Sequence, residues 1–298
     1  MGKQNELKKI GEIYRELRLD KGTKLSNYID KGFSKSQLSR FERGETEISL
    51  IKFLSALDFI NVSIEEFMVI YRGYRNDSFE ELLKKLHTLS LTKDAEGLRY
   101  LFNEVEELPN STTKKIEKIL ILSCLSSVES ENLITQSDLR FVTDYLFGIE
   151  SWGYYELSIL GNLAQYINGE TLVSLGREVL RKTDYYYEVV RNRKLVIQLS
   201  INIMIRCIES EWFTKAAFFE RHIDSLVNVE SDMYEKVIFS YVQGYLKFAM
   251  GDSGGKQIMQ ESLEIFKLLK NTRLYKINCK NKCNIYLNSS SRASQAVL

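Results

Sequence analysis

Proline is almost absent from this sequence: Pro109 is the single proline among 298 residues. Proline breaks helices and marks turns, and no stretch alternates apolar and polar residues as a half-buried strand does. These two absences predict an all-α protein, helical almost throughout. The length exceeds that of one small module and suits two domains.

Cysteine and histidine are also scarce. The four cysteines are Cys124, Cys207, Cys279 and Cys283. Four are too few for a disulfide framework in a chain of this length, so we interpret them as reduced thiols of a cytoplasmic protein. The role of Cys279 and Cys283, spaced as Cys-x-x-x-Cys, stays open. Because His87 and His222 are the only histidines, we expect no zinc site, no other metal and no cofactor.

Long apolar runs and catalytic motifs are missing. The longest apolar candidate, 195–208, is interrupted by Gln198, Asn202 and Arg206, so it falls short of the roughly eighteen apolar residues that a membrane span needs. The polar start, residues 1–6, predicts no signal peptide. No Gly-rich phosphate loop, Gly-x-Ser-x-Gly motif or metal-ligand spacing occurs. We therefore expect neither membrane association nor enzymatic activity.

The net charge of +1 conceals an asymmetry along the chain. Residues 1–52 carry 12 Lys/Arg and 8 Asp/Glu, which leaves +4 there and −3 for the remainder. A basic N-terminal module on a slightly acidic body fits nucleic-acid binding.

The stretch from Ser34 to Gly44 predicts a short helix with two different faces. Ser34 is an N-cap, Gly44 ends the helix, and Leu38 and Phe41 point inward. Further short helices are expected at 7–19, 25–29, 49–59 and 63–71, with Leu50, Phe53, Leu54 and Leu57 inward in the fourth of the five helices. Five short helices in one segment, the second and third joined by a tight turn, indicate a helix-turn-helix domain over residues 1–71.

The outward face of the third helix carries side chains suited to DNA. Gln37 can make two hydrogen bonds to adenine, and Arg40 can make two to guanine. Short hydroxyls and flexible cations suit phosphates or base edges. The predicted DNA contacts are Arg15, Ser34, Lys35, Ser36, Gln37, Ser39, Arg40 and Arg43. The alternative is a solvated helix face without a partner.

This segment resembles the lambda-repressor/Cro-like (XRE) family. The resemblance rests on Arg18-x-x-x-Gly22, Leu25, Ser34-x-Ser36-Gln37-Leu38-Ser39, Phe41-Glu42-Arg43-Gly44 and Ile64-Glu65-Glu66-Phe67. It implies that Arg18 and Glu42 form an internal ion pair, which joins the first helix to the end of the third. Glu42 is then a structural residue rather than a DNA contact.

Helical patterns continue after a short polar hinge at 72–77. The expected helices are about 78–91, 92–107, 112–129, 136–149, 152–167, 170–182, 188–209, 212–228, 231–250, 256–270 and 273–287. Pairing them gives units of about 40 residues, the size of helical-hairpin repeats. The segment 240–266 resembles a tetratricopeptide (TPR) unit, with a small residue where its helices cross. We predict a TPR-like solenoid over 78–287 and a disordered Ser-rich tail at 288–298.

Three alternate helices of this region carry stripes at helical spacing that mix apolar, amide, basic and tyrosine side chains. Amides bond both groups of an extended peptide backbone, and tyrosine combines apolar area with a polar tip. The alternative is ordinary packing between helices. The predicted peptide-binding residues, with Tyr186 at a loop rim, are Tyr155, Asn162, Tyr166, Tyr186, Arg191, Gln198, Asn202, Tyr234 and Tyr241.

The whole chain resembles the Rgg/MutR family within the peptide-sensing RRNPP group. The residues that suggest it are 39–44, 61–67 and Trp152-Gly153-Tyr154-Tyr155-Glu156-Leu157 followed by Asn162. The resemblance implies a homodimeric, cytoplasmic transcriptional regulator of Gram-positive bacteria. Its repeat domain would bind a short hydrophobic pheromone peptide, and its two recognition helices would read a palindromic operator. The alternative is a repressor whose repeats form a protein-interaction scaffold without a peptide ligand.

Overall fold

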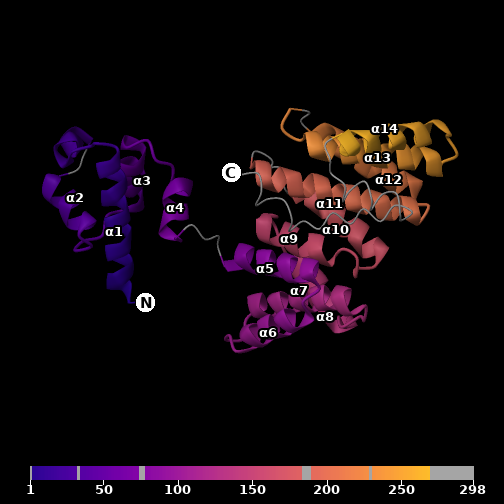
Figure 1. The fold of residues 1–298 in the computed structure, drawn as a ribbon, viewed down its shortest axis with the longest axis horizontal. Coiled ribbons are helices and arrows are strands. Elements are labelled where there is room, and N and C mark those ends of the chain that lie inside the picture. Colours follow the sequence, from indigo (N-terminus) through magenta and orange to yellow (C-terminus); the bar gives the residue numbers. More distant parts are fainter. Residues whose placement is uncertain (1, 32–33, 74–77, 183–188, 228–229, 269–298) are drawn as a thin grey trace. The chain divides into compact units, whose positions relative to one another are not determined.

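The structure is a computed structural model that describes residues 2–31, 34–73, 78–182, 189–227 and 230–268 (Figure 1). Every regular element within these ranges is helical, which confirms the all-α prediction. The chain forms two compact units, Met1–Leu82 and Leu83–Leu298, called here the first and the second unit. The expectations for residues 74–77, 273–287 and 288–298 lie outside the described residues.

Local capping signals set where the helices of the first unit begin. Its elements are α1 (Lys3–Asp20), the 3-10 helix η1 (Leu25–Lys31), α2 (Lys35–Glu42), α3 (Leu50–Phe59) and α4 (Ile64–Tyr71). The predicted serine caps precede three of them: Ser34, Ser49 and Ser63 each accept a hydrogen bond from a backbone N–H two to three residues into the helix. Ser63 and Glu66 also form the predicted capping box.

The core of the first unit differs from the sequence-based expectation on α3. Leu57 is buried and Phe53 half-buried, as expected, but Leu50 and Leu54 are 69% and 38% exposed. The inward face of α3 runs through Phe53, Ala56 and Leu57, and Leu54 lies about 100° around the helix from Phe53. Leu50, at the first turn, lines an open apolar groove with residues of α1 and α4. The prediction that Leu50 and Leu54 point inward is therefore wrong.

Gly44 allows the end of α2 to approach α1 closely. Its φ is +70°, and a Cβ placed there would lie 2.5 Å from the Cα of Lys8. The Gly44 carbonyl also accepts a hydrogen bond of 3.0 Å from Gln4 Nε2. Because glycine is the residue that tolerates both this φ and this contact, Gly44 fixes where α2 ends relative to α1.

The second unit consists of helical hairpins. Its helices, the first of which crosses the boundary between the units, are α5 (Ser78–Thr92), α6 (Ala95–Glu106), α7 (Thr112–Glu129), α8 (Gln136–Phe147), α9 (Tyr154–Leu163), α10 (Gly169–Lys182), α11 (Val190–Glu209), α12 (Phe213–Leu226), α13 (Met233–Ala249) and α14 (Gly254–Leu268). The alternate helices α7, α9, α11 and α13 contact one another in that order, and α12 and α14 pack on α11 and α13 (Figure 1). This is the arrangement of a TPR-like solenoid.

The hairpin of α13 and α14 contains the predicted small residue at its crossing. A Cβ on Gly244 would lie 2.8 Å from the carbonyl oxygen of Gly255, so the two backbones are nearly in contact there. A larger side chain would separate the helices. The sequence pattern at 240–266 therefore reflects the packing of the two helices.

The sequence predicts neither a metal site nor a membrane span, and the residues in the described ranges were examined for both features. No group of His, Cys, Asp and Glu there is arranged to hold a metal ion. No helix there combines the length and the apolar character needed to cross a bilayer. Cys279 and Cys283 lie outside these ranges.

Candidate nucleic-acid and ligand interfaces

Helix α2 separates its side chains into a buried and an outward set. Leu38, Phe41 and Glu42 are at most 4% exposed. The predicted contact residues lie off that face: Ser34, Lys35, Ser36, Arg40 and Arg43 are exposed, and Gln37 and Ser39 are half-buried. Arg15 is exposed on α1. The outward face of α2 therefore offers hydroxyl, amide and guanidinium groups to a partner.

Arg18 and Glu42 form a buried ion pair with two hydrogen bonds. Arg18 Nε donates to Glu42 Oε1 at 2.5 Å, and Nη2 donates to Oε2 at 2.9 Å. The remaining Arg18 nitrogen, Nη1, donates to the Thr23 carbonyl. The two side chains are 5% and 4% exposed, and the hydrogen bond to Glu42 raises the pKa of Arg18. The pair joins α1 to the end of α2, and so it holds α2 in place.

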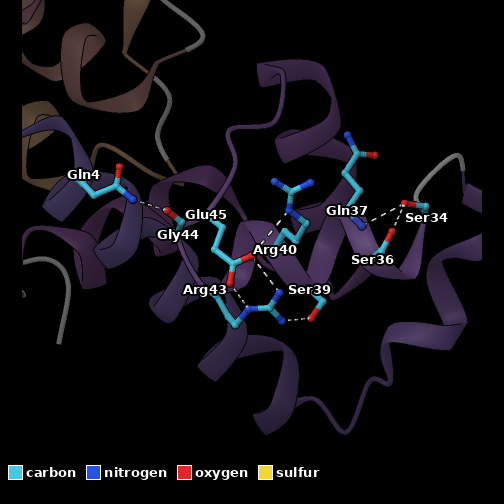
Figure 2. A network of polar contacts seen from close by, with 9 residues as sticks. All are labelled: Gln4, Ser34, Ser36, Gln37, Ser39, Arg40, Arg43, Gly44 and Glu45. Carbon is cyan, nitrogen blue, oxygen red and sulfur yellow. Dashed lines mark hydrogen bonds and ion pairs between the residues drawn. The ribbon is translucent and has the colours of Figure 1, made fainter.

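A carboxylate that the sequence analysis did not single out lies among the outward arginines. Glu45 accepts hydrogen bonds of 2.6 and 3.0 Å from Arg43, and Arg40 Nε lies 3.7 Å from Glu45 Oε2 (Figure 2). Arg43 also donates to Ser39 Oγ at 2.6 Å. Its guanidinium holds the pKa of Glu45 below its usual range. The spacing Arg40, Arg43, Glu45 around the end of a helix is the sequence signal for this cluster.

Ser34 already has structural partners, although it was predicted as a DNA contact. Its Oγ accepts the Gln37 backbone N–H at 3.0 Å and lies 3.2 Å from Ser36 Oγ (Figure 2). A serine in this position fixes the start of α2. A hydrogen bond from the exposed Ser34 hydroxyl to DNA would therefore be made in addition to its capping role.

In the second unit, the predicted stripe on α11 lies between its two neighbouring helices. The guanidinium of Arg191 is 3.2 Å from the ring centre of Tyr154 on α9. Gln198 Nε2 donates to Glu235 Oε1 on α13 at 3.0 Å. Asn202 is 7% exposed. The stripe thus combines links between helices with a buried amide.

The predicted residues of α9, and Tyr166 beyond its end, are engaged in local contacts. The helix expected at 152–167 ends at Leu163, so Tyr166 lies in the turn that follows it. Tyr166 donates from its hydroxyl to the Ser123 carbonyl on α7 at 2.8 Å, and Asn162 Nδ2 donates to the Ser158 carbonyl of its own helix at 2.8 Å. Burial raises the pKa of Tyr155 to about 12. These contacts correspond to the packing alternative.

The predicted residues of α13 are Tyr234, which is half-buried, and Tyr241. The Tyr234 ring packs 6.1 Å from the Phe266 ring of α14, and Tyr241 is 3% exposed. Tyr186 lies outside the described residues.

Two buried carboxylates at the start of α13 were missed by the sequence analysis. Asp232 and Glu235 are 0% and 3% exposed. Arg193 Nε lies 3.4 Å from Asp232, and Lys194 Nζ lies 3.9 Å from Glu235. These pairs join α11 to α13 beside Gln198. Their partners are about 40 residues apart in the chain, so no local pattern signals them.

A separate polar cavity of about 850 Å³ lies between α8, the α9–α10 connection and α11. Its polar lining residues include Arg140, Asp144, Gln165, Asn168 and Arg206. Tyr166 also borders it, alone among the predicted peptide-binding residues that the structure describes. The cavity is therefore distinct from the α11 stripe.

The fold and the outward face of α2 define the class of the protein as a helix-turn-helix transcriptional regulator with a helical-repeat second unit. Residues 98–277 match the C-terminal domain of the HTH-type transcriptional regulator Rgg. The chain belongs to the Rgg family, which confirms the resemblance seen in the sequence.

Crystal structures of related proteins share the fold. The SHP pheromone receptor Rgg2 of Streptococcus dysgalactiae is 36% identical, over 89% of this chain and 96% of that chain, with a TM-score of 0.81. A single-site variant of that receptor is 35% identical, over 93% of this chain and 100% of that chain, with a TM-score of 0.83. A Listeria monocytogenes EGD-e protein is 20% identical, over 92% and 95% of the two chains, with a TM-score of 0.80.

Proposed function

We propose that the first unit binds duplex DNA by placing α2 in the major groove. The observation that carries this proposal is the division of α2, which buries Leu38, Phe41 and Glu42 and turns Gln37 and Arg40 outward. Gln37 and Arg40 have the reach and the hydrogen-bonding groups to read base edges. The phosphate contacts would come from Arg15, Ser34, Lys35, Ser36, Ser39 and Arg43.

The protein acts in this proposal as a homodimer in the cytoplasm. Two copies of α2 then enter successive major grooves about one helical turn apart, so the operator is palindromic. Its role is regulation rather than catalysis.

The second unit, in this proposal, binds a short hydrophobic peptide. The 35% identical relative that this chain covers end to end is a pheromone receptor, and α11 carries a stripe of Arg191, Gln198 and Asn202 between α9 and α13. The apolar rings of Tyr155, Tyr166 and Tyr234 would contact apolar peptide side chains. This relative favours the peptide receptor over the scaffold alternative.

Replacement of Arg40 tests the DNA part. The full-length protein first selects its operator from a library of randomised duplexes, and Arg40→Ala is then compared with it on the selected operator and on a scrambled duplex. Loss of a base contact costs about 1–3 kcal/mol on the operator, and the affinity for the scrambled duplex falls much less. Unchanged affinity and sequence preference would rule out α2 as the reader.

A peptide titration tests the second part. Fluorescently labelled short hydrophobic peptides are added to the full-length protein, and their anisotropy is followed. Saturable binding should weaken in Arg191→Ala and in Asn202→Ala, while the matched control Asn103→Ala, an exposed asparagine on α6, should bind normally. Absence of binding by every peptide would favour the scaffold.

A further inference from the structure

Gln37, one of the two outward base-reading candidates, is held at its backbone and at its side chain. Its backbone N–H donates to Ser34 Oγ at 3.0 Å. Its side-chain oxygen, Oε1, accepts a hydrogen bond of 3.0 Å from Lys52 Nζ on the first turn of α3. Lys52 is itself placed by the cap of that helix, since its backbone N–H donates to Ser49 Oγ at 3.3 Å. Gln37 and Arg40 extend from adjacent turns of α2 (Figure 2).

The chemistry of this contact fixes which way the Gln37 amide faces. An ammonium group has three donors and no acceptor. The oxygen of the amide must therefore face Lys52, and the amide NH2 group must face away from it. A glutamine without such an anchor can exchange its oxygen and nitrogen by rotation about its last torsion.

The fixed amide changes the base edge that Gln37 matches. Adenine requires both a donor and an acceptor, because its major-groove edge carries the N7 acceptor and the N6 amino donor. The Lys52 charge beside Oε1 opposes the approach of that amino group. Guanine presents two acceptors, N7 and O6, which match the two N–H groups of Gln37 and the nearby positive charge.

We propose that Lys52 is a specificity-determining residue, which orients the Gln37 amide so that Gln37 reads guanine rather than adenine. This inference rests on the proposed function, in which α2 enters the major groove. Lys52 acts through Gln37 and is a positioning residue. The competing role for Lys52 is a plain phosphate contact, which would act independently of Gln37.

Selection from a library of randomised duplexes tests the proposal with the full-length protein. The variants are Lys52→Met, which keeps the length and the apolar stem, Lys52→Arg, which keeps a donor, Gln37→Ala, and the double variant. Lys256→Met, an exposed lysine on α14 in the second unit, controls for the loss of one positive charge.

The unsubstituted protein and Lys52→Arg should select guanine at one position of each half-site. Lys52→Met should change the guanine-to-adenine ratio at that position alone, about tenfold. In the Gln37→Ala background, Lys52→Met should not change the guanine-to-adenine ratio any further. Retention of the base preferences at all other operator positions by Lys52→Met shows that this variant is folded.

Two results would overturn the proposal. The first is a uniform loss of affinity for all duplexes in Lys52→Met, with a salt dependence shallower by about 0.9 and the same loss in the Gln37→Ala background. The second is an unchanged base preference in Lys52→Met. If Arg40→Ala still loses the base preference that Arg40 provides, this second result overturns the role of Lys52 and leaves the proposed function intact. Failure of the unsubstituted protein to select any sequence would overturn the proposed function and this inference together.

Discussion

Replacement of Glu42 by glutamine should destabilise the first unit far more than its small chemical change suggests. Glu42→Gln keeps the shape of the side chain and removes its charge. Arg18, at 5% exposed, then keeps a full charge without a carboxylate partner. Removal of one member of a buried ion pair costs about 3–5 kcal/mol, because the other charge stays buried.

The same substitution at Glu45 is a matched control. Glu45 also accepts two hydrogen bonds from an arginine, Arg43, but the two side chains are 47% and 50% exposed. Exposed pairs contribute about 0–1 kcal/mol. Glu42→Gln and Glu45→Gln therefore differ in burial and share their chemistry.

Hydrogen exchange followed by mass spectrometry measures the effect in the full chain. Both tryptophans, Trp152 and Trp212, lie in the second unit, so tryptophan fluorescence does not report on the first. For Glu42→Gln, amides of α1 and α2 should exchange about 150- to 5,000-fold faster, the equivalent of 3–5 kcal/mol. Amides of α11 serve as the internal reference. Equal, small effects of Glu42→Gln and Glu45→Gln would refute the assignment of Arg18 and Glu42 as a buried pair that holds α2.

Glu45→Gln should tighten operator binding and steepen its salt dependence by about 0.9, since Arg43 becomes free for a phosphate; an unchanged slope would contradict this. Gly22→Ala should lower the free energy of unfolding of the first unit by about 1 kcal/mol through its positive φ alone, and Gly44→Ala by clearly more, because its Cβ also meets backbone; equal effects in hydrogen exchange would contradict this. Burial raises the pKa of Tyr155 to about 12 in the folded state, against about 10 when unfolded. The neutral Tyr155 hydroxyl therefore contributes fully to the free energy of unfolding below about pH 10, and this contribution is lost as the pH rises towards about 12. In urea unfolding followed by tryptophan fluorescence, the free energy of unfolding of Tyr155→Phe should therefore fall less between pH 10 and pH 12 than that of the unsubstituted protein.

Local signals predicted the elements of the first unit well. The caps Ser34, Ser49 and Ser63 and the closing glycine Gly44 act within a few residues, so the sequence alone reveals them. Burial on α3 was harder to predict. Whether Leu50 is buried depends on which helix packs beside the first turn of α3. Tertiary packing decides this, and the spacing of apolar residues along α3 does not.

The candidate sites show the same division between local and long-range information. The outward face of α2 follows from its own sequence, but Glu45 and Lys52 act on it from the neighbouring turn and the next helix. In the second unit, Tyr166 was predicted to continue the stripe of α9, but it lies in the turn after Leu163 and bonds the Ser123 carbonyl of α7. Helical spacing identifies residues that share a face, and it does not say which neighbour that face meets.

Protection of arginine side chains by bound operator shows whether the outward face of α2 contacts DNA. The full-length protein is treated with an arginine-specific reagent, with and without its selected operator, and modified residues are identified by mass spectrometry. Arg181, 68% exposed on α10, is the internal reference. Bound operator should protect Arg40 and Arg43 and leave Arg181 reactive. Equal reactivity of Arg40 in free and operator-bound protein would contradict this prediction.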